Sequence, residues 1–328
     1  MKNNRVILTT AAACAIMLVS GSVAAEENWQ EGMIADQSFE VTLSEYSGKV
    51  WFAAYPPSDS MDVILKIVQD KETLETLATY TPEFVSAYSF TSLDAVSFVD
   101  YNGDGNTDIL IIKTFGDQTV PVIYEGTPDQ EEKFTLKAEL SVRAKQQAEE
   151  MTIAGVQAYL ASADAEIGSP AAALPDGIPG NFVFASGVGA WGTSLTLNAD
   201  GSFSGSYSDT DMIGGDGYEA TRYYSDFSGS FDDIRQVSEH VYFLHVAQLQ
   251  LADEPGTQSI SDNCLNLATN PYGMKANGDY YLYLPGAEIS ELPIVPASNW
   301  SGIEYSGTTL TSWVLYNIAD ADPFGGFE

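Results

Sequence analysis

The chain has 328 residues, of which 46 are acidic and 13 are basic, so its formal net charge is −33. This charge argues against nucleic acid and anionic membranes as partners, because both repel an acidic protein. Hydrophobic residues make up 45% of the chain, which is ordinary for a globular protein, so the acidity belongs to the surface and does not indicate disorder. The length favours two domains.

The first 25 residues have the pattern of an export signal. Two basic residues precede an apolar stretch over residues 6–19, and small residues follow at 22–25. We expect cleavage after Ala25. The alternative is a lipoprotein anchored through Cys14, but the apolar stretch continues past this cysteine. No later segment reaches the roughly 18 apolar residues that a membrane span needs, so we expect a secreted or cell-surface protein without an integral membrane segment.

Residues 26–162 have the pattern of a β-rich domain that ends in helices. Apolar and β-branched segments predict strands at residues 39–43, 49–55, 61–68, 73–80, 95–99, 109–112, 120–124 and 134–136. Good helix formers over residues 140–150 and helical spacing over residues 152–160 predict two helices. We therefore expect an α+β amino-terminal domain.

A linker and a second, purely β domain are expected after this point. Residues 163–180 are dominated by Ala, Pro and Gly, which is typical of a connector. From residue 181 to 328 the predicted strands are short and separated by turns, at residues 194–198, 202–207, 221–231, 241–251, 280–284 and, as the last strand, 310–318. Such a series predicts an antiparallel β-barrel or a sandwich. We favour the barrel because closure removes exposed sheet edges. The expected fold class of the whole chain is mainly β.

The strongest chemical signal is the nine-residue segment DYNGDGNTD, residues 100–108. It places oxygen-bearing side chains at loop positions 1, 3, 5 and 9 and a glycine, Gly105, at position 6, where a sharp turn is needed. The predicted Ca²⁺ ligands are Asp100, Asn102, Asp104, Asn106 through its backbone carbonyl, and Asp108. Three carboxylates this close repel one another unless a cation lies between them. The alternative is a hairpin turn rich in Asp, Asn and Gly that holds no metal.

The residues on either side of this loop show that it is not an EF-hand. Apolar β-branched residues on both sides predict strands, and position 12 is Ile111 where an EF-hand has a bidentate Glu. A strand, then DxNGDGxxD, then a strand resembles the calcium loop of the FG-GAP/VCBS repeats of integrin-like propellers. The resemblance implies metal binding by the loop residues named above. Because the sequence holds one copy and propellers need several blades, only the loop and its two strands are carried over.

The carboxy-terminal half has a second, weaker resemblance. The segments SGVGAWGTSLTLNADGSFSGSYSD, YYSDFSGSF and YYLYLPG are similar to a module of uncharacterised exported proteins of Firmicutes. This resemblance brings no active site. Together with the export signal it implies a bacterial cell-surface or secreted protein.

No set of residues in the sequence predicts catalysis. The only two histidines, His240 and His245, are expected on opposite faces of one strand. Cys264 is the one cysteine outside the signal, and we expect a small buried apolar role for it. The metalloprotease, hydrolase and redox motifs HExxH, GxSxG and CxxC are absent from the sequence.

Two further features bear on binding. Asp209, Asp211 and Asp216 could form a second calcium site, although a solvated loop is the favoured interpretation because their spacing differs from that of residues 100–108. Aromatic residues make up 12% of the chain, and adjacent tyrosines on a strand face opposite ways, so we expect some to be exposed and able to contact sugars or proteins.

The sequence therefore predicts an exported, non-enzymatic calcium-binding protein that acts as a surface binding or adhesion module for an unknown protein or glycan. Two alternatives stay open. One is a hydrolase of the cell envelope or of glycans, which needs only two suitably placed carboxylates. The other is a β-barrel that binds a small ligand.

Overall fold

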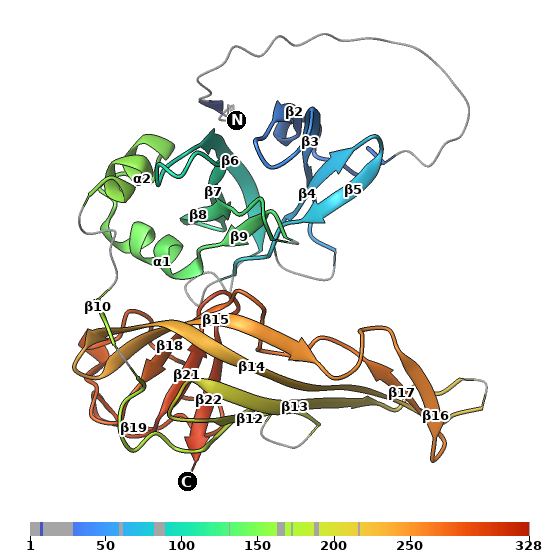
Figure 1. Cartoon of the computed structure of the whole chain (residues 1–328), viewed down its shortest axis with the longest axis vertical. Coiled ribbons are helices and arrows are strands. Elements are labelled where there is room, and N and C mark those ends of the chain that lie inside the picture. The colour runs from blue at the N-terminus through green and yellow to red at the C-terminus, as the bar shows by residue number, and fades with distance from the viewer. Residues whose placement is uncertain are drawn as a thin grey trace. The chain divides into compact units, whose positions relative to one another are not determined.

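The computed structural model describes residues 7–8, 29–58, 62–81, 89–130, 132–162, 168–171, 173–186, 190–215 and 217–327. The chain forms two compact units, Met1–Ala165 and Glu166–Glu328, which we call the amino-terminal and carboxy-terminal units (Figure 1). Apart from the two-residue strand β1 (Ile7–Leu8), the predicted signal, its cleavage site and Cys14 lie outside the described residues. The fold is mainly β, as the sequence predicts.

The first sheet of the amino-terminal unit carries the candidate loop. Its strands are β6 (Phe90–Val99), β7 (Asp108–Phe115), β8 (Gln118–Gly126) and β9 (Phe134–Leu136), and β1 pairs with β6 in parallel. The neighbours follow the order β1-β6-β7-β8-β9, and the pairs from β6 onward are antiparallel. The sequence DILIIKTF of β7 is buried on both faces, which explains why its apolar residues do not alternate with polar ones.

A second antiparallel sheet packs on one face of the first. It consists of β2 (Phe39–Thr42), β3 (Lys49–Tyr55), β4 (Ile64–Gln69) and β5 (Glu72–Thr76), in that order, and a short 3₁₀ turn η1 (Ala35–Gln37) precedes it. The ring of Phe98 on β6 lies 5.8 Å from the ring of Phe39 and 5.7 Å from that of Phe52. Contacts between these aromatic rings hold the two sheets together.

Two helices cover the other face of the first sheet (Figure 1). They are α1 (Ala138–Gln147) and α2 (Ile153–Leu160), as predicted. Thr152 caps α2, because its hydroxyl accepts the Gly155 N–H at 3.1 Å. One apolar cluster joins helices and sheet and contains Leu110, Ile112, Ile123, Ala144, Ile153, Val156 and Tyr159. Neither helix, and no other helix among the described residues, is long and apolar enough to cross a membrane.

The carboxy-terminal unit is a closed antiparallel barrel. Its strands are β11 (Asn181–Ala185), β12 (Trp191–Leu197), β13 (Ser202–Asp211), β14 (Ala220–Ser238), β15 (Val241–Leu251), β18 (Asp279–Tyr283), β21 (Val314–Asn317) and β22 (Asp322–Phe327). Each strand pairs with the next one in this series, and β22 pairs back with β11. The sequence left a barrel and a sandwich open, and the structure has the barrel.

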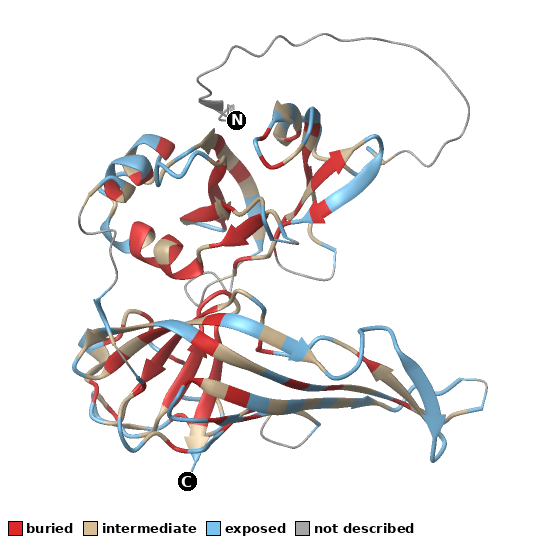
Figure 2. Cartoon of the chain, in the orientation of Figure 1, coloured by how far each residue is buried: buried red, intermediate tan, exposed pale blue. Residues whose placement is uncertain are grey.

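The barrel interior is packed with apolar side chains, seen as the buried positions of its strands in Figure 2. The buried members are Leu174, Phe182, Phe184, Leu195, Leu197, Phe203, Phe227, Phe231, Leu244, Val246, Met274, Tyr280, Leu282, Leu315 and Phe324. The expectation that adjacent tyrosines leave some side chains exposed is wrong for β18, because Tyr280, Tyr281 and Tyr283 are all fully buried. Tyr281 and Tyr283 stack on each other at 5.7 Å outside the interior cluster.

Several strands differ from their predicted bounds. The segment 310–318 is not the last strand, since it divides between β20 (Thr309–Leu310), which pairs with β19 (Tyr305–Ser306), and β21, and β22 follows. A short turn, η4 (Ile289–Glu291), precedes them. In the predicted linker, β10 (Ser169–Pro170) pairs with β14 and Leu174 is buried in the barrel core. The segment from Ser169 onward therefore belongs to the carboxy-terminal unit.

Strand β14 is 19 residues long and extends beyond the barrel (Figure 1). Its first residues pair with β13 on one side and, in parallel, with β17 (Cys264–Ala268) on the other. Strand β16 (Gln258–Ser261) pairs with β17 and ends this series, and all four of its residues are exposed. Closure of the barrel therefore does not remove every sheet edge, because β16 keeps one.

Candidate metal centre

The loop at residues 100–108 connects β6 to β7, as the sequence predicts, and Val99 and Asp108 form the last pair of the strand ladder. Asp100 organises the loop. Its Oδ1 accepts the backbone N–H groups of Gly103 at 2.6 Å and Asp104 at 3.2 Å, and its Oδ2 accepts that of Gly105 at 2.9 Å. Gly105 has a φ of 89°, a left-handed conformation that glycine adopts without strain. The predicted sharp turn at position 6 is thus present.

The middle of the loop exposes oxygen-bearing side chains. Asp104 Oδ1 accepts the Asn106 N–H at 2.8 Å, and Asp104 Oδ2 accepts the Asn102 amide at 3.2 Å. The hydrogen bond from Asn106 is the main reason that the pKa of Asp104 lies below its ordinary value. Asn102 and Asp104 therefore lie side by side at the surface with Asp104 ionised.

Asp108 differs from the other carboxylates because it is fully buried. Its Oδ1 accepts the Gly126 N–H and its Oδ2 accepts the Tyr101 N–H, both at 2.9 Å. Burial raises its pKa to about 6, the two hydrogen bonds oppose the shift, and the acidic groups of Asp104 and Glu125 add to it. Both charged side chains that act on Asp108 are thus negative. A bound cation would offset the repulsion between these carboxylates.

The donor set fits a hard cation by its chemistry, since carboxylate, amide and carbonyl oxygens are the ligands that Ca²⁺ takes. The structure brings Asp100, Asn102 and Asp104 together at the surface of the loop. It does not bring all three carboxylates to one point, and no group of three Asp, Glu, His or Cys side chains among the described residues is arranged to hold a metal. Asp108 lies behind the loop with both oxygens occupied by backbone N–H groups.

Sequence reasoning missed the residues that attach the loop to the second sheet. Ser44 and Glu45, in the turn between β2 and β3, bind Thr107. The Thr107 N–H donates to Ser44 Oγ and to Glu45 Oε1, both at 2.7 Å, and the two hydroxyl groups lie 2.7 Å apart. These residues are separated by 62 or 63 positions in the chain, so no local pattern could reveal the contact.

Gly126, at the end of β8, makes this close approach possible. A Cβ atom at this position would lie 2.5 Å from the Thr107 carbonyl oxygen, 2.9 Å from Glu45 Oε1 and 3.2 Å from the Asn106 Cβ. Only a residue without a side chain fits between the loop and Glu45. The Gly126 N–H also donates a hydrogen bond to Asp108. The same residue therefore contacts Asp108 and leaves room for the contact between Thr107 and Glu45.

The remaining candidates belong to the carboxy-terminal unit. His245 on β15 contacts Asp279 at 2.8 Å, whereas His240 precedes the strand and contacts Glu291 at 3.2 Å. The two histidines are therefore not on one strand. Cys264 is half-buried rather than buried. Asp209 and Asp211 lie on strand β13 and not in the expected solvated loop, and Asp216 lies outside the described residues. The second calcium site stays an untested alternative.

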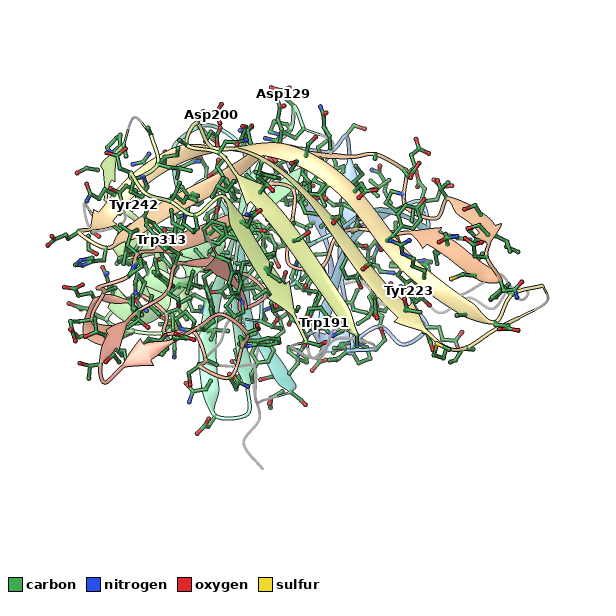
Figure 3. All side chains as sticks on the ribbon, turned by 90° about the horizontal axis from the view of Figure 1, so that it is seen from below. Asp129, Trp191, Asp200, Tyr223, Tyr242 and Trp313 are labelled. Carbon is green, nitrogen blue, oxygen red and sulfur yellow. The ribbon has the colours of Figure 1, made fainter. Side chains whose placement is uncertain are left out.

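Four aromatic side chains lie near one another in the carboxy-terminal unit. Tyr272 is exposed, the other three are half-buried, and Trp191 also packs against the barrel core. Trp191, Asp209 and Tyr223 occupy one row across β12, β13 and β14, and Figure 3 shows Trp191 and Tyr223 on these strands. The ring of Tyr272 lies 5.0 Å from that of Trp191 and 6.5 Å from that of Tyr207. Tyr272 is 47% exposed. We call Trp191, Tyr207, Tyr223 and Tyr272 the aromatic patch.

Comparison of the chain with protein-family models, with curated proteins and with solved structures finds no match.

Proposed function

We propose that this chain is an exported calcium-binding protein that acts as a binding or adhesion module at the bacterial surface, without catalysis of its own. The observation that carries the proposal is the loop at residues 100–108, where a network centred on Asp100 fixes the turn and leaves oxygen donors at the surface. The cation would be held by Asp100, Asn102, Asp104, the Asn106 carbonyl and Asp108. The ion would neutralise the acidic charge around Asp108 and stiffen the connection between β6 and β7.

The affinity expected for this site is moderate. The donor set has three carboxylates and lacks the bidentate Glu of an EF-hand, and part of the loop must rearrange to bring Asp108 to the ion. Extracellular calcium modules of comparable charge have dissociation constants on the order of 10⁻⁴ to 10⁻³ M. Such a value suits a protein outside the cell, where the ion is abundant.

The aromatic patch supports the binding role. Tyr272 is exposed, and the half-buried rings of Trp191, Tyr207 and Tyr223 lie beside it on strands. Exposed aromatic faces contact sugars and proteins. Asp209, in the same row as Trp191 and Tyr223, adds a hydrogen-bond acceptor. The alternative of a small ligand inside the barrel has less support, because side chains pack against each other there. The rings of Phe203 and Phe231, for example, lie 5.0 Å apart.

Isothermal titration of the purified protein with CaCl₂ tests the proposal. The matched pair of variants is Asp104→Ala, in the loop, and Asp117→Ala, an exposed carboxylate in the β7–β8 turn of the same sheet. We expect one calcium site in the wild type and in Asp117→Ala, and no binding in Asp104→Ala. Equal binding by all three proteins, or by none, would remove residues 100–108 as the site.

A further inference from the structure

Glu45 is the one carboxylate outside residues 100–108 that hydrogen-bonds to the backbone of the candidate loop in the described part of the chain. Its Oε1 accepts the Thr107 N–H at 2.7 Å and the Ser44 hydroxyl at 2.6 Å. The side chain is 9% exposed, and it comes from the turn between β2 and β3, in the other sheet. A buried, ionisable side chain is thus directed at the loop from an element far away in sequence.

The second oxygen of this carboxylate is unsatisfied. Glu45 Oε2 is buried and has no hydrogen-bond partner in the structure. Burying a carboxylate oxygen without a partner is unfavourable, and such a group calls for a functional explanation. A cation bound nearby would provide one, because its positive charge offsets the desolvation of the carboxylate.

The bond from Thr107 links Glu45 to a predicted ligand. The Thr107 N–H and the Asn106 C=O belong to the same peptide group, and in a trans peptide they point in opposite directions. An anionic acceptor on the N–H therefore fixes the direction of the carbonyl and polarises the peptide, which places more negative charge on the carbonyl oxygen. Partners of this kind orient metal ligands and strengthen them.

We infer that Glu45 is a positioning residue of the calcium site, which holds the Asn106–Thr107 peptide so that the Asn106 carbonyl faces the ion. The inference rests on the proposed function, since it requires that the loop binds calcium. It adds that calcium binding is coupled to the attachment of the β2–β3 turn, because the same carboxylate joins the turn to the loop.

Glu45→Gln isolates the charge of this residue. The amide keeps an oxygen that can accept the Thr107 N–H and has nearly the same shape, so the protein should fold. Without calcium the variant should melt no lower than the wild type, because a neutral amide is less unfavourable to bury than a carboxylate with an unsatisfied oxygen. Its calcium dissociation constant, measured by isothermal titration of the purified full chain, should rise about tenfold.

Glu75→Gln is the matched control. Glu75 is also 9% exposed and also joins the two sheets, and it even accepts the hydroxyl of Tyr46 in the same β2–β3 turn at 2.5 Å. Its other partners are the backbone N–H groups of Phe134 at 3.0 Å and Lys133 at 3.1 Å, so it binds no backbone group of the loop. A structural role alone would predict that both variants melt lower and bind calcium equally well. Our inference predicts weaker calcium binding in Glu45→Gln only.

The outcomes separate the two proposals. Wild-type calcium affinity in Glu45→Gln, with no binding in Asp104→Ala, overturns the role of Glu45 and leaves the calcium site standing. No calcium binding by the wild type overturns both. Hydrogen exchange of the unmutated protein gives an independent measurement: calcium should slow exchange of the amides at residues 43–46 as well as those at 100–108. Slowing confined to residues 100–108 would contradict the coupling.

Discussion

The buried ion pair between Lys113 and Asp62 connects the two sheets of the amino-terminal unit. Lys113 Nζ lies 2.5 Å from Asp62 Oδ2, and both side chains are buried. Asp62 also accepts the backbone N–H groups of Val63 at 2.8 Å and Tyr80 at 3.1 Å. Burial lowers the pKa of Lys113, and Asp62 opposes that shift. A buried ion pair is costly to break, because removing one partner leaves an uncompensated buried charge, and we infer that this pair helps to fix one arrangement of the sheets.

Replacing Lys113 tests this interpretation. Lys113→Met should lower the free energy of unfolding by about 3–5 kcal/mol, because it takes the ammonium away from a buried carboxylate. Lys49→Met removes the lysine of an exposed ion pair with Glu40 and should change stability by less than about 1 kcal/mol. Urea denaturation of both variants gives the comparison. Equal losses of unfolding free energy in the two variants would show that the buried pair stabilises the protein no more than the exposed one.

Asp322, at the start of β22, should make stability fall as pH rises. Burial raises its pKa to about 8, Asp320 adds to the shift and Lys275 opposes it. Its Oδ2 is buried without a hydrogen-bond partner. Between the unfolded pKa near 4 and the folded pKa, the folded state binds the extra proton, so stability declines with rising pH by at most about 1.4 kcal/mol per unit.

Asp322→Asn should therefore flatten this pH dependence and melt higher than the wild type at pH 8. The control is Asp176→Asn, which changes an exposed carboxyl in the same unit. Thermal melts from pH 5 to pH 8 make the test. The same slope in Asp322→Asn and the wild type would show that Asp322 is not the group responsible.

The sequence predicts local structure well where the signal lies in consecutive residues, as in the loop between β6 and β7 and its turn at Gly105. The calcium ligands in that loop stay a prediction. Glu45, Gly126 and the Lys113–Asp62 pair could not be found in this way, because their roles depend on contacts between distant strands. An isolated Glu in a chain with 46 acidic residues carries no signal of its own.

At the level of elements, strands with a clear apolar period were predicted well, and β3, β9 and β15 match their expected bounds. Strand β22 was missed because its sequence, DPFGGF, contains one Pro and two Gly residues, which normally indicate a turn. The glycines fit the close packing there: a Cβ at Gly325 would lie 2.7 Å from the Cα of Gly302. Tertiary contacts outweigh the local preference at this strand.

Strand β22 closes the barrel, so its inward side chain should matter for stability. Phe324→Ala should lower the free energy of unfolding by about 3–5 kcal/mol, because Phe324 is fully buried in the interior cluster and its loss leaves a cavity. Phe327→Ala, on the same strand but 41% exposed, should cost less than about 1 kcal/mol. Denaturant titration distinguishes them, and similar losses for both would contradict the assigned inward and outward faces.

At the level of the whole molecule, the chain combines two units with separate cores. The amino-terminal unit carries the loop between β6 and β7, next to the β2–β3 turn of its second sheet, and the carboxy-terminal unit is a packed barrel that carries the aromatic patch. Because two units can unfold independently, calorimetry should resolve two transitions. A ligand that binds the folded form of one unit stabilises that unit alone, so calcium should move one transition and leave the other in place.

The most direct test of the account is differential scanning calorimetry of the protein in EGTA and across a calcium titration, with Asp104→Ala alongside. At 100 times the dissociation constant, calcium should stabilise the unit that binds it by about 2.7 kcal/mol. We predict that one transition of the wild type rises with calcium and that neither transition of Asp104→Ala moves. If the wild type does not respond, or if the variant responds equally, residues 100–108 form only a turn.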